Sequence, residues 1–243
     1  MRVVMNENFE SVDAGLTPDP FNSVTATGGN AAAASAGNGF GGSQSMRMTF
    51  AGVNIPCFGL KTYSFTVKLV RGYLELQGSF NIRDAGLIAN QFATLLDVRD
   101  GATSLVQLRW VVNADPTKGV VRLFDTVAGV GVSGTTLISE NTFFSIKIRI
   151  FKSGLVLLFL NGGITPEVSM TLAAPATQFT NTRVGVSNAS AVPSILAIID
   201  ADSISIRHFL YAAGSGINSF DAQGNSLNRN IGIILGGEDV GIY

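Results

Sequence analysis

The sequence predicts an all-β protein that folds as a two-sheet antiparallel β-sandwich, or jelly roll, and three observations predict it. Apolar and polar residues alternate along many short segments, which is the pattern of half-buried strands. Turn residues separate these segments, and no segment longer than ten residues keeps a helical period. About ten strands joined by such turns need two packed sheets to bury their apolar sides.

The predicted strands occupy the middle of the chain. The clearest is 144–150, where Phe144, Ile146 and Ile148 face one side and polar side chains face the other. The segment 155–160 is apolar on both sides, so it is either a central strand or one whose outer side meets another subunit. The remaining predicted strands are 46–50, 63–69, 92–98, 106–112, 121–123, 184–186 and 196–207, with Trp110 on an apolar side.

The two ends of the chain differ in composition from this middle. Residues 21–45 carry no charge and consist largely of small residues, so they predict a loop or an extended arm. We therefore divide the chain into 1–45, an N-terminal strand with this loop or arm, 46–208, the sandwich, and 209–243, a C-terminal arm or terminal strand. The side chains by which the C-terminal arm would bind a partner are Ile231, Ile233, Ile234, Leu235 and Tyr243.

The charge balance narrows the classes of partner. Lys and Arg number 16 against 17 Asp and Glu, which argues against a nucleic-acid-binding protein and a polybasic membrane-surface protein. Only 14% of the residues are charged, where about 25% is typical, and the mean hydropathy is +0.34. These values predict a surface that is buried against partner subunits. Cys57 is the single cysteine, which excludes an intrachain disulfide and a cysteine-based metal cluster.

Four segments of the chain resemble parts of a known fold family. They are 7–10, 40–50, 143–162 and 198–206, and they resemble the opening, the first core strand, the central hairpin and the closing strand of the concanavalin A-like (laminin-G-like) jelly roll. That family includes lectins, glycoside hydrolases and non-catalytic modules, some of them parts of phage particles. The resemblance therefore implies the fold and leaves the function to be argued from the site.

Candidate catalytic and metal-binding side chains are sparse. Glucanases of the resembled family carry Glu-x-Asp-x-Glu on one strand, and this sequence has no such run. Asp200 and Asp202 are weak candidates for Ca²⁺ ligands, because Ca²⁺ needs about 6–8 oxygen atoms. We favour the interpretation that both are solvated where the strand leaves the core. His208 is the only histidine, and no Gly-x-Ser-x-Gly nucleophile motif accompanies it.

The resemblance, the low charge and the candidate arms together predict a non-enzymatic phage virion structural protein, synthesised in the host cytoplasm. It would be a capsid decoration or cement protein, or another head- or tail-attached module. Its partners would be the major capsid or tail proteins of the particle and further copies of itself. The alternative is a lectin-like carbohydrate-binding module, or a fibre component, that recognises a host surface glycan. We expect no catalytic residue and no cofactor, and neither nucleic acid nor a membrane as a partner.

Overall fold

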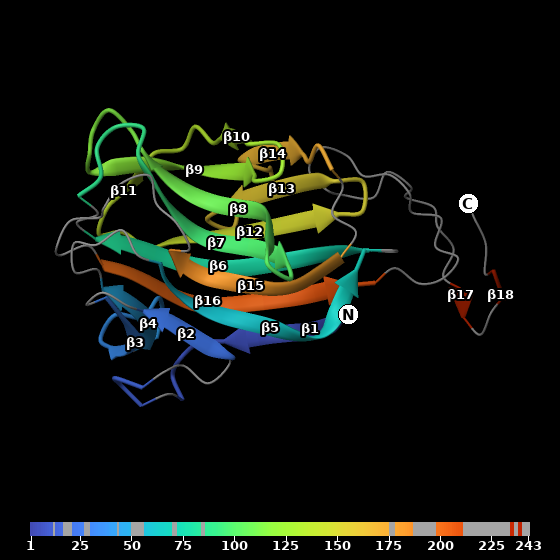
Figure 1. Cartoon of the computed structure of the whole chain (residues 1–243), viewed down its shortest axis with the longest axis horizontal. Coiled ribbons are helices and arrows are strands. Elements are labelled where there is room, and N and C mark those ends of the chain that lie inside the picture. Colours follow the sequence, from blue (N-terminus) through green and yellow to red (C-terminus); the bar gives the residue numbers. More distant parts are fainter. Residues whose placement is uncertain are drawn as a thin grey trace.

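The computed structural model confirms the predicted fold class, because its described residues form two eight-stranded antiparallel sheets, one separate two-stranded pair and no helix. It describes residues 1–11, 13–16, 21–26, 30–42, 44–49, 56–69, 72–83, 86–174, 178–186 and 198–210, and the backbone of 234–235 and 238–239. Within these ranges there is no helix with the length and hydropathy to cross a membrane. Figure 1 shows the strands running along the long axis of the sandwich.

Sheet A contains eight strands. They are β1 (Arg2–Glu7), β3 (Ala31–Ala36), β4 (Gln44–Thr49), β6 (Tyr73–Arg83), β12 (Phe144–Phe151), β13 (Leu155–Leu160), β14 (Val168–Thr171) and β16 (Ile198–Phe209). Their order across the sheet is β14–β13–β12–β6–β16–β4–β3, and β1 also pairs with β16.

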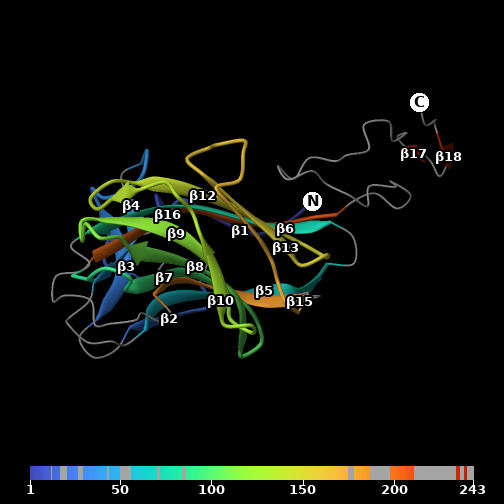
Figure 2. The same cartoon turned by 90° about the horizontal axis from the view of Figure 1, so that it is seen from above.

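Sheet B also contains eight strands. They are β2 (Ser23–Ala26), β5 (Cys57–Lys68), β7 (Phe92–Asp100), β8 (Thr103–Val112), β9 (Lys118–Asp125), β10 (Val130–Ser133), β11 (Ile138–Ser139) and β15 (Gln178–Val186). Their order is β10–β9–β8–β7–β15–β5–β2, with β11 paired to β9. In Figure 2 the two sheets form two layers, with β12 and β16 in one and β7 and β5 in the other.

The core lies between the sheets and follows from the alternation in each strand. In β12, Ile146, Ile148 and Ile150 are buried in this core, whereas the residues between them face outward. Trp110 is fully buried in the same core, as the sequence predicts. Cys57 is also buried, and burial raises the pKa of its thiol to about 12, so it remains a neutral apolar side chain.

The N-terminal region is part of the sandwich, so the prediction of a loop or arm over 21–45 is wrong for much of that segment. Its residues form β2 at the edge of sheet B and β3 at the edge of sheet A. An edge strand needs only backbone hydrogen bonds to one neighbour, and Ala or Ser side chains do not hinder them. The side chain of Phe21 also fills the space over Gly59, where an added Cβ would lie 2.7 Å from the ring.

Two strands of sheet A bear on the sequence prediction, one against it and one in agreement with it. Strand β6 was not predicted, although it lies at the centre of sheet A between β12 and β16. Its alternation is regular from Leu74 to Ile82, apart from Gly78 at one inward position. Strand β13 was predicted and has a neighbour on each side, which agrees with the interpretation as an internal strand.

The proposed C-terminal arm lies almost entirely outside the described residues. Of its predicted partner-binding residues, only Ile234 and Leu235 fall in a described element, and there only their backbone is described. They form β17 (Ile234–Leu235), which pairs with β18 (Glu238–Asp239). The side chains of that arm therefore remain a sequence-based prediction.

Candidate functional site

The outer face of sheet B carries a row of charged and polar side chains. Alternation places them there, because the intervening residues of β7, β8 and β9 fill the core. The strand register sets Asp97 opposite Gln107 on one side and opposite Arg183 on the other. It also sets Arg109 directly opposite Arg122. We call the side chains of Asp97, Arg99, Gln107, Arg109, Arg122 and Arg183 the arginine face.

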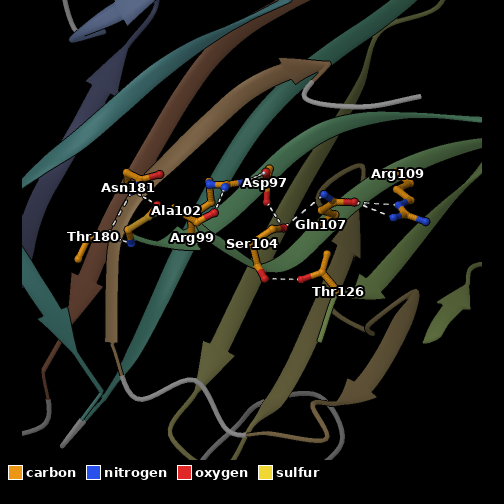
Figure 3. A network of polar contacts seen from close by, with 10 residues as sticks. Asp97, Arg99, Ala102, Ser104, Gln107, Arg109, Thr126, Thr180 and Asn181 are labelled. Atoms are coloured by element: carbon orange, nitrogen blue, oxygen red, sulfur yellow. Dashed lines mark hydrogen bonds and ion pairs between the residues drawn. The ribbon is translucent and has the colours of Figure 1, made fainter. Parts of the chain in front are cut away.

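Hydrogen bonds order one half of this face. Arg99 Nη1 donates to Asp97 Oδ2 at 2.6 Å, and Ser104 Oγ donates to Asp97 Oδ1 at 2.5 Å. Arg109 donates from Nε and Nη2 to Gln107 Oε1 at 3.0 and 2.8 Å. Figure 3 shows these contacts crossing neighbouring strands in one continuous line. The network fixes the positions of the guanidinium groups before any ligand arrives.

Aromatic rings form the second part of the face. The guanidinium carbon of Arg109 lies 3.4 Å from the ring centre of Phe124 and 4.0 Å from that of Phe92. Arg183 lies over Phe58 at 4.4 Å in the same way. Stacking on rings suits the flat, weakly hydrated guanidinium, and the edge of the Arg109 group donates to Gln107.

The positive charge of this face exceeds the negative charge that the structure places beside it. Within the described residues, Arg99 is the one arginine of the face with an ion pair, to Asp97. Burial first, and then the charge of Arg122, lower the pKa of Arg109 to about 10, and Asp97 opposes this shift. Burial and Arg99 also lower the pKa of Arg183, whose Nε atom is buried without a hydrogen-bond partner. Crowded cations with an unused donor make this face a candidate site for an anion.

The predicted Ca²⁺ candidates lie on the other sheet and are not solvated, so the favoured interpretation of them is wrong. Asp200 is fully buried on the outer face of sheet A, where Arg47 Nε donates to it at 2.7 Å and Arg83 Nε at 2.9 Å. Strand β16 does not leave the core there, because it continues between β6 and β4. Two arginines neutralise this carboxylate, which leaves it a poor ligand for a cation.

Asp202 also lies within β16 and is buried. Its carboxylate accepts hydrogen bonds from the backbone N–H of Phe40 at 2.6 Å and of Ser203 at 2.5 Å. Burial raises the pKa of Asp202, and the charge of Glu10 raises it further, against those hydrogen bonds. In the part of the chain that the structure describes, no three His, Cys, Asp or Glu side chains are grouped to hold a metal ion.

Sequence reasoning missed the arginine face, although its signal was present. The apolar residues of 92–98, 106–112 and 121–123 predicted these strands, and the polar residues between them carried the signal of the face. Those polar residues include Asp97, Gln107, Arg109 and Arg122, which alternation alone assigns to one sheet face. Predicting which residues surround Arg183 requires the order of the strands in the sheet. This is because β15 pairs with β7 although the two strands are 70 residues or more apart in the sequence.

Comparisons with known proteins address the fold. No family model matches the chain, and no curated protein matches it. Among solved structures, the cellulose-induced protein Cip1 superposes with a TM-score of 0.61 at 15% identity, over 86% of this chain and 100% of Cip1. Because the sequence identity is low, this similarity shows a shared fold and nothing more.

Two further solved structures are similar at a comparable level. A carbohydrate esterase from the Shiga toxin-encoding bacteriophage phi24B has a TM-score of 0.58 at 15% identity, over 84% of this chain and 97% of the esterase. An endo-β-1,4-glucuronan lyase from the fungus Trichoderma reesei has a TM-score of 0.56 at 9% identity, over 84% of this chain and 95% of the lyase. The chain therefore has a jelly-roll fold that carbohydrate-active proteins also use, which agrees with the predicted concanavalin A-like architecture.

Proposed function

We propose that this chain is a carbohydrate-binding module that holds an acidic polysaccharide along the outer face of sheet B. The observation that carries the proposal is the arginine face, where Arg109, Arg122 and Arg183 have no carboxylate partner among the described residues. A guanidinium binds a carboxylate through two parallel hydrogen bonds, so uronate units fit this donor set. The ligand in this proposal supplies the negative charge that the face lacks.

The similar structures support a sugar polymer over other anions. One of them is a glucuronan lyase and another a carbohydrate esterase, and both names refer to carbohydrates. A nucleic acid would also supply negative charge, but the whole chain has a net charge of −1, and nucleic-acid-binding domains usually carry a basic excess. We therefore choose the polysaccharide and keep nucleic acid as an outcome of the test.

The proposal is binding without turnover, in line with the prediction of a non-enzymatic protein. Asp97 is the carboxylate at the middle of the face, and Arg99 and Ser104 already occupy both of its oxygen atoms. In this proposal Asp97 positions Arg99 and Ser104 within the face.

A role in a virus particle is the second candidate, and the edge of sheet B favours it. Strand β10 ends the sheet, and its Val130 and Val132 side chains are exposed. Leu137 is exposed nearby in sequence, and Ile164 is 87% exposed in the turn before β14. An exposed apolar edge strand can pair with another chain, such as a capsid or tail protein or a second copy. Particle attachment through this edge and recognition of a host glycan through the arginine face are compatible.

The test is native gel electrophoresis of the whole chain through gels that contain a polysaccharide. We expect glucuronan or alginate to retard the protein, and a neutral β-glucan to leave its mobility unchanged. Arg109→Ala with Arg122→Ala should strongly reduce the retardation, whereas Lys68→Ala, which removes an exposed charge from β5, should keep it. Retardation by single-stranded DNA but by neither uronate polymer would replace the proposal with a nucleic-acid-binding function. Mobility that no polymer changes would reject both.

A further inference from the structure

A pocket on the opposite sheet suggests a second site. It has a volume of about 240 Å³ and opens on the outer face of sheet A. Its wall includes Gln77 and Ser79 of β6, Lys147 of β12, Phe159 of β13 and Ser203 of β16. In Figure 2 the strands β12 and β16 lie in the layer away from β7 and β5, so this pocket and the arginine face are on opposite sides of the molecule.

A β-bulge in β16 shapes one wall of the pocket. The register between β16 and β6 shifts between Asp202 and Ser205, and Ser203 in the shift has a φ of 52°. That left-handed conformation is costly for a serine, and such strain concentrates at functional sites. The bulge also exposes the Ser203 side chain at the pocket, whereas Asp202 and Ser205 on either side are buried.

The wall offers one cation, several hydroxyl groups and one ring. The Lys147 amine lies 4.7 Å from the ring centre of Phe159 and has no ion pair within the described residues. Ser79 and Ser145 add hydroxyl groups on neighbouring strands, at positions that face each other. Beside the wall, the buried Oγ of Ser205 has no hydrogen-bond partner and lies opposite Gln77 in the register. This combination of a ring, hydroxyls and one amine fits a sugar that carries a carboxylate.

We propose that this pocket is a second saccharide site that binds one carboxylated sugar unit, with Lys147 pairing with its carboxylate. The size of the pocket suits a single ring, whereas the arginine face can follow a chain across several strands. The inference takes its ligand class from the proposed function but rests on its own residues. A module with saccharide sites on both sides can join two polymer segments, and such bivalence raises its apparent affinity for a dense glycan surface.

The experiment is a titration of the isotope-labelled chain followed by amide NMR shifts, with sodium glucuronate and glucose as probes. We expect glucuronate to shift the amides of Ser79, Ser145 and Gly162 saturably, and glucose to shift them far less. Lys147→Ala should weaken this binding about tenfold, the effect of losing one charged contact of about 1.4 kcal/mol. Lys152→Ala, an exposed lysine in the turn after β12, is the matched control and should bind as the original chain does.

The outcomes separate this inference from the proposed function. Arg109→Ala should leave the pocket shifts unchanged, since the arginine face is on the other sheet. Pocket amides that do not move, equal binding of glucose, or full affinity in Lys147→Ala would each overturn the second site. If glucuronate shifts the pocket amides but not the amides of Arg109 and Arg183, the result counts against the arginine face and not against the pocket.

Discussion

Arg109 shows how one residue of the arginine face is prepared for a ligand. Its guanidinium lies against the rings of Phe92 and Phe124, and Gln107 accepts two of its hydrogen bonds. The pKa of about 10 is lower than usual for an arginine but leaves the group charged at neutral pH. The cation is therefore held in a fixed orientation with little mobility left to lose on binding.

Replacing Arg109 with lysine tests whether this geometry matters beyond the charge. Lys keeps the cation but not the planar group that stacks and donates two parallel hydrogen bonds. We expect Arg109→Lys to weaken binding of glucuronan about tenfold, measured by the retardation in affinity electrophoresis. Binding equal to that of the original chain would show that only net charge contributes.

The burial of His208 predicts that the stability of the fold depends on pH. This residue is buried opposite Arg2 in the pairing of β16 with β1, and burial first, then Arg2, lower its pKa below the ordinary 6.5. A lowered pKa in the folded state means that the unfolded chain takes up the proton first as the pH falls. The stability linked to His208 is therefore complete above pH 6.5 and is lost as the pH falls from there through the folded-state pKa.

The measurement is the urea midpoint of unfolding at about pH 7.5 and about pH 5.5. The original chain should lose more stability between these values than His208→Gln, which has no proton to take up. Equal losses in both chains would contradict a depressed pKa for His208.

At the scale of the strand, β16 joins the two halves of sheet A and carries two of its buried carboxylates, Asp200 and Asp202. Asp200 sits at the middle of this join and is paired with Arg47 from β4 and Arg83 from β6. The Arg47 and Arg83 side chains are 23% and 31% exposed, so water screens them in part. The ion pairs connect three strands, so their loss should affect the whole sheet.

Asp200→Asn should lower the free energy of unfolding by about 2 kcal/mol, because two half-buried arginines lose their anion. Urea unfolding measures the change. The matched control is Asp115→Asn, whose ion pair with Lys118 is exposed on both sides and should contribute nothing measurable. Similar behaviour of the two variants would show that the Asp200 pairs do not stabilise the sheet.

Strands were predictable from the sequence where the residues on their two sides formed a clear pattern, either alternating or apolar throughout. Strand β12 alternates cleanly, and β13 is apolar throughout, so both were predicted. The segment 31–36 was predicted as a loop or arm because alanines show no alternation, yet backbone pairing alone makes it the edge strand β3. Arg183 could not be placed on the arginine face without the order of the strands, since β15 inserts between β7 and β5.

At the scale of the whole molecule, every described strand of sheets A and B lies within residues 1–210. Strand β17 pairs only with β18 among the described strands, and neither joins sheet A or sheet B. Deleting 231–243 should therefore leave the thermal unfolding midpoint unchanged, as measured by circular dichroism. If these residues form the partner-binding arm, the same deletion should weaken attachment to a particle. Loss of the cooperative transition would show instead that the segment belongs to the fold.

The most direct test of the account is isothermal titration calorimetry of the whole chain with purified glucuronan. The account predicts saturable binding by the original chain and by Lys68→Ala, and loss of the heat of binding that belongs to the arginine face in Arg109→Ala with Arg122→Ala. It also predicts that added salt weakens this binding, because the contacts are ionic. Unchanged binding in the double arginine variant, or no binding by any of the chains, would contradict the assignment of an acidic polysaccharide to sheet B.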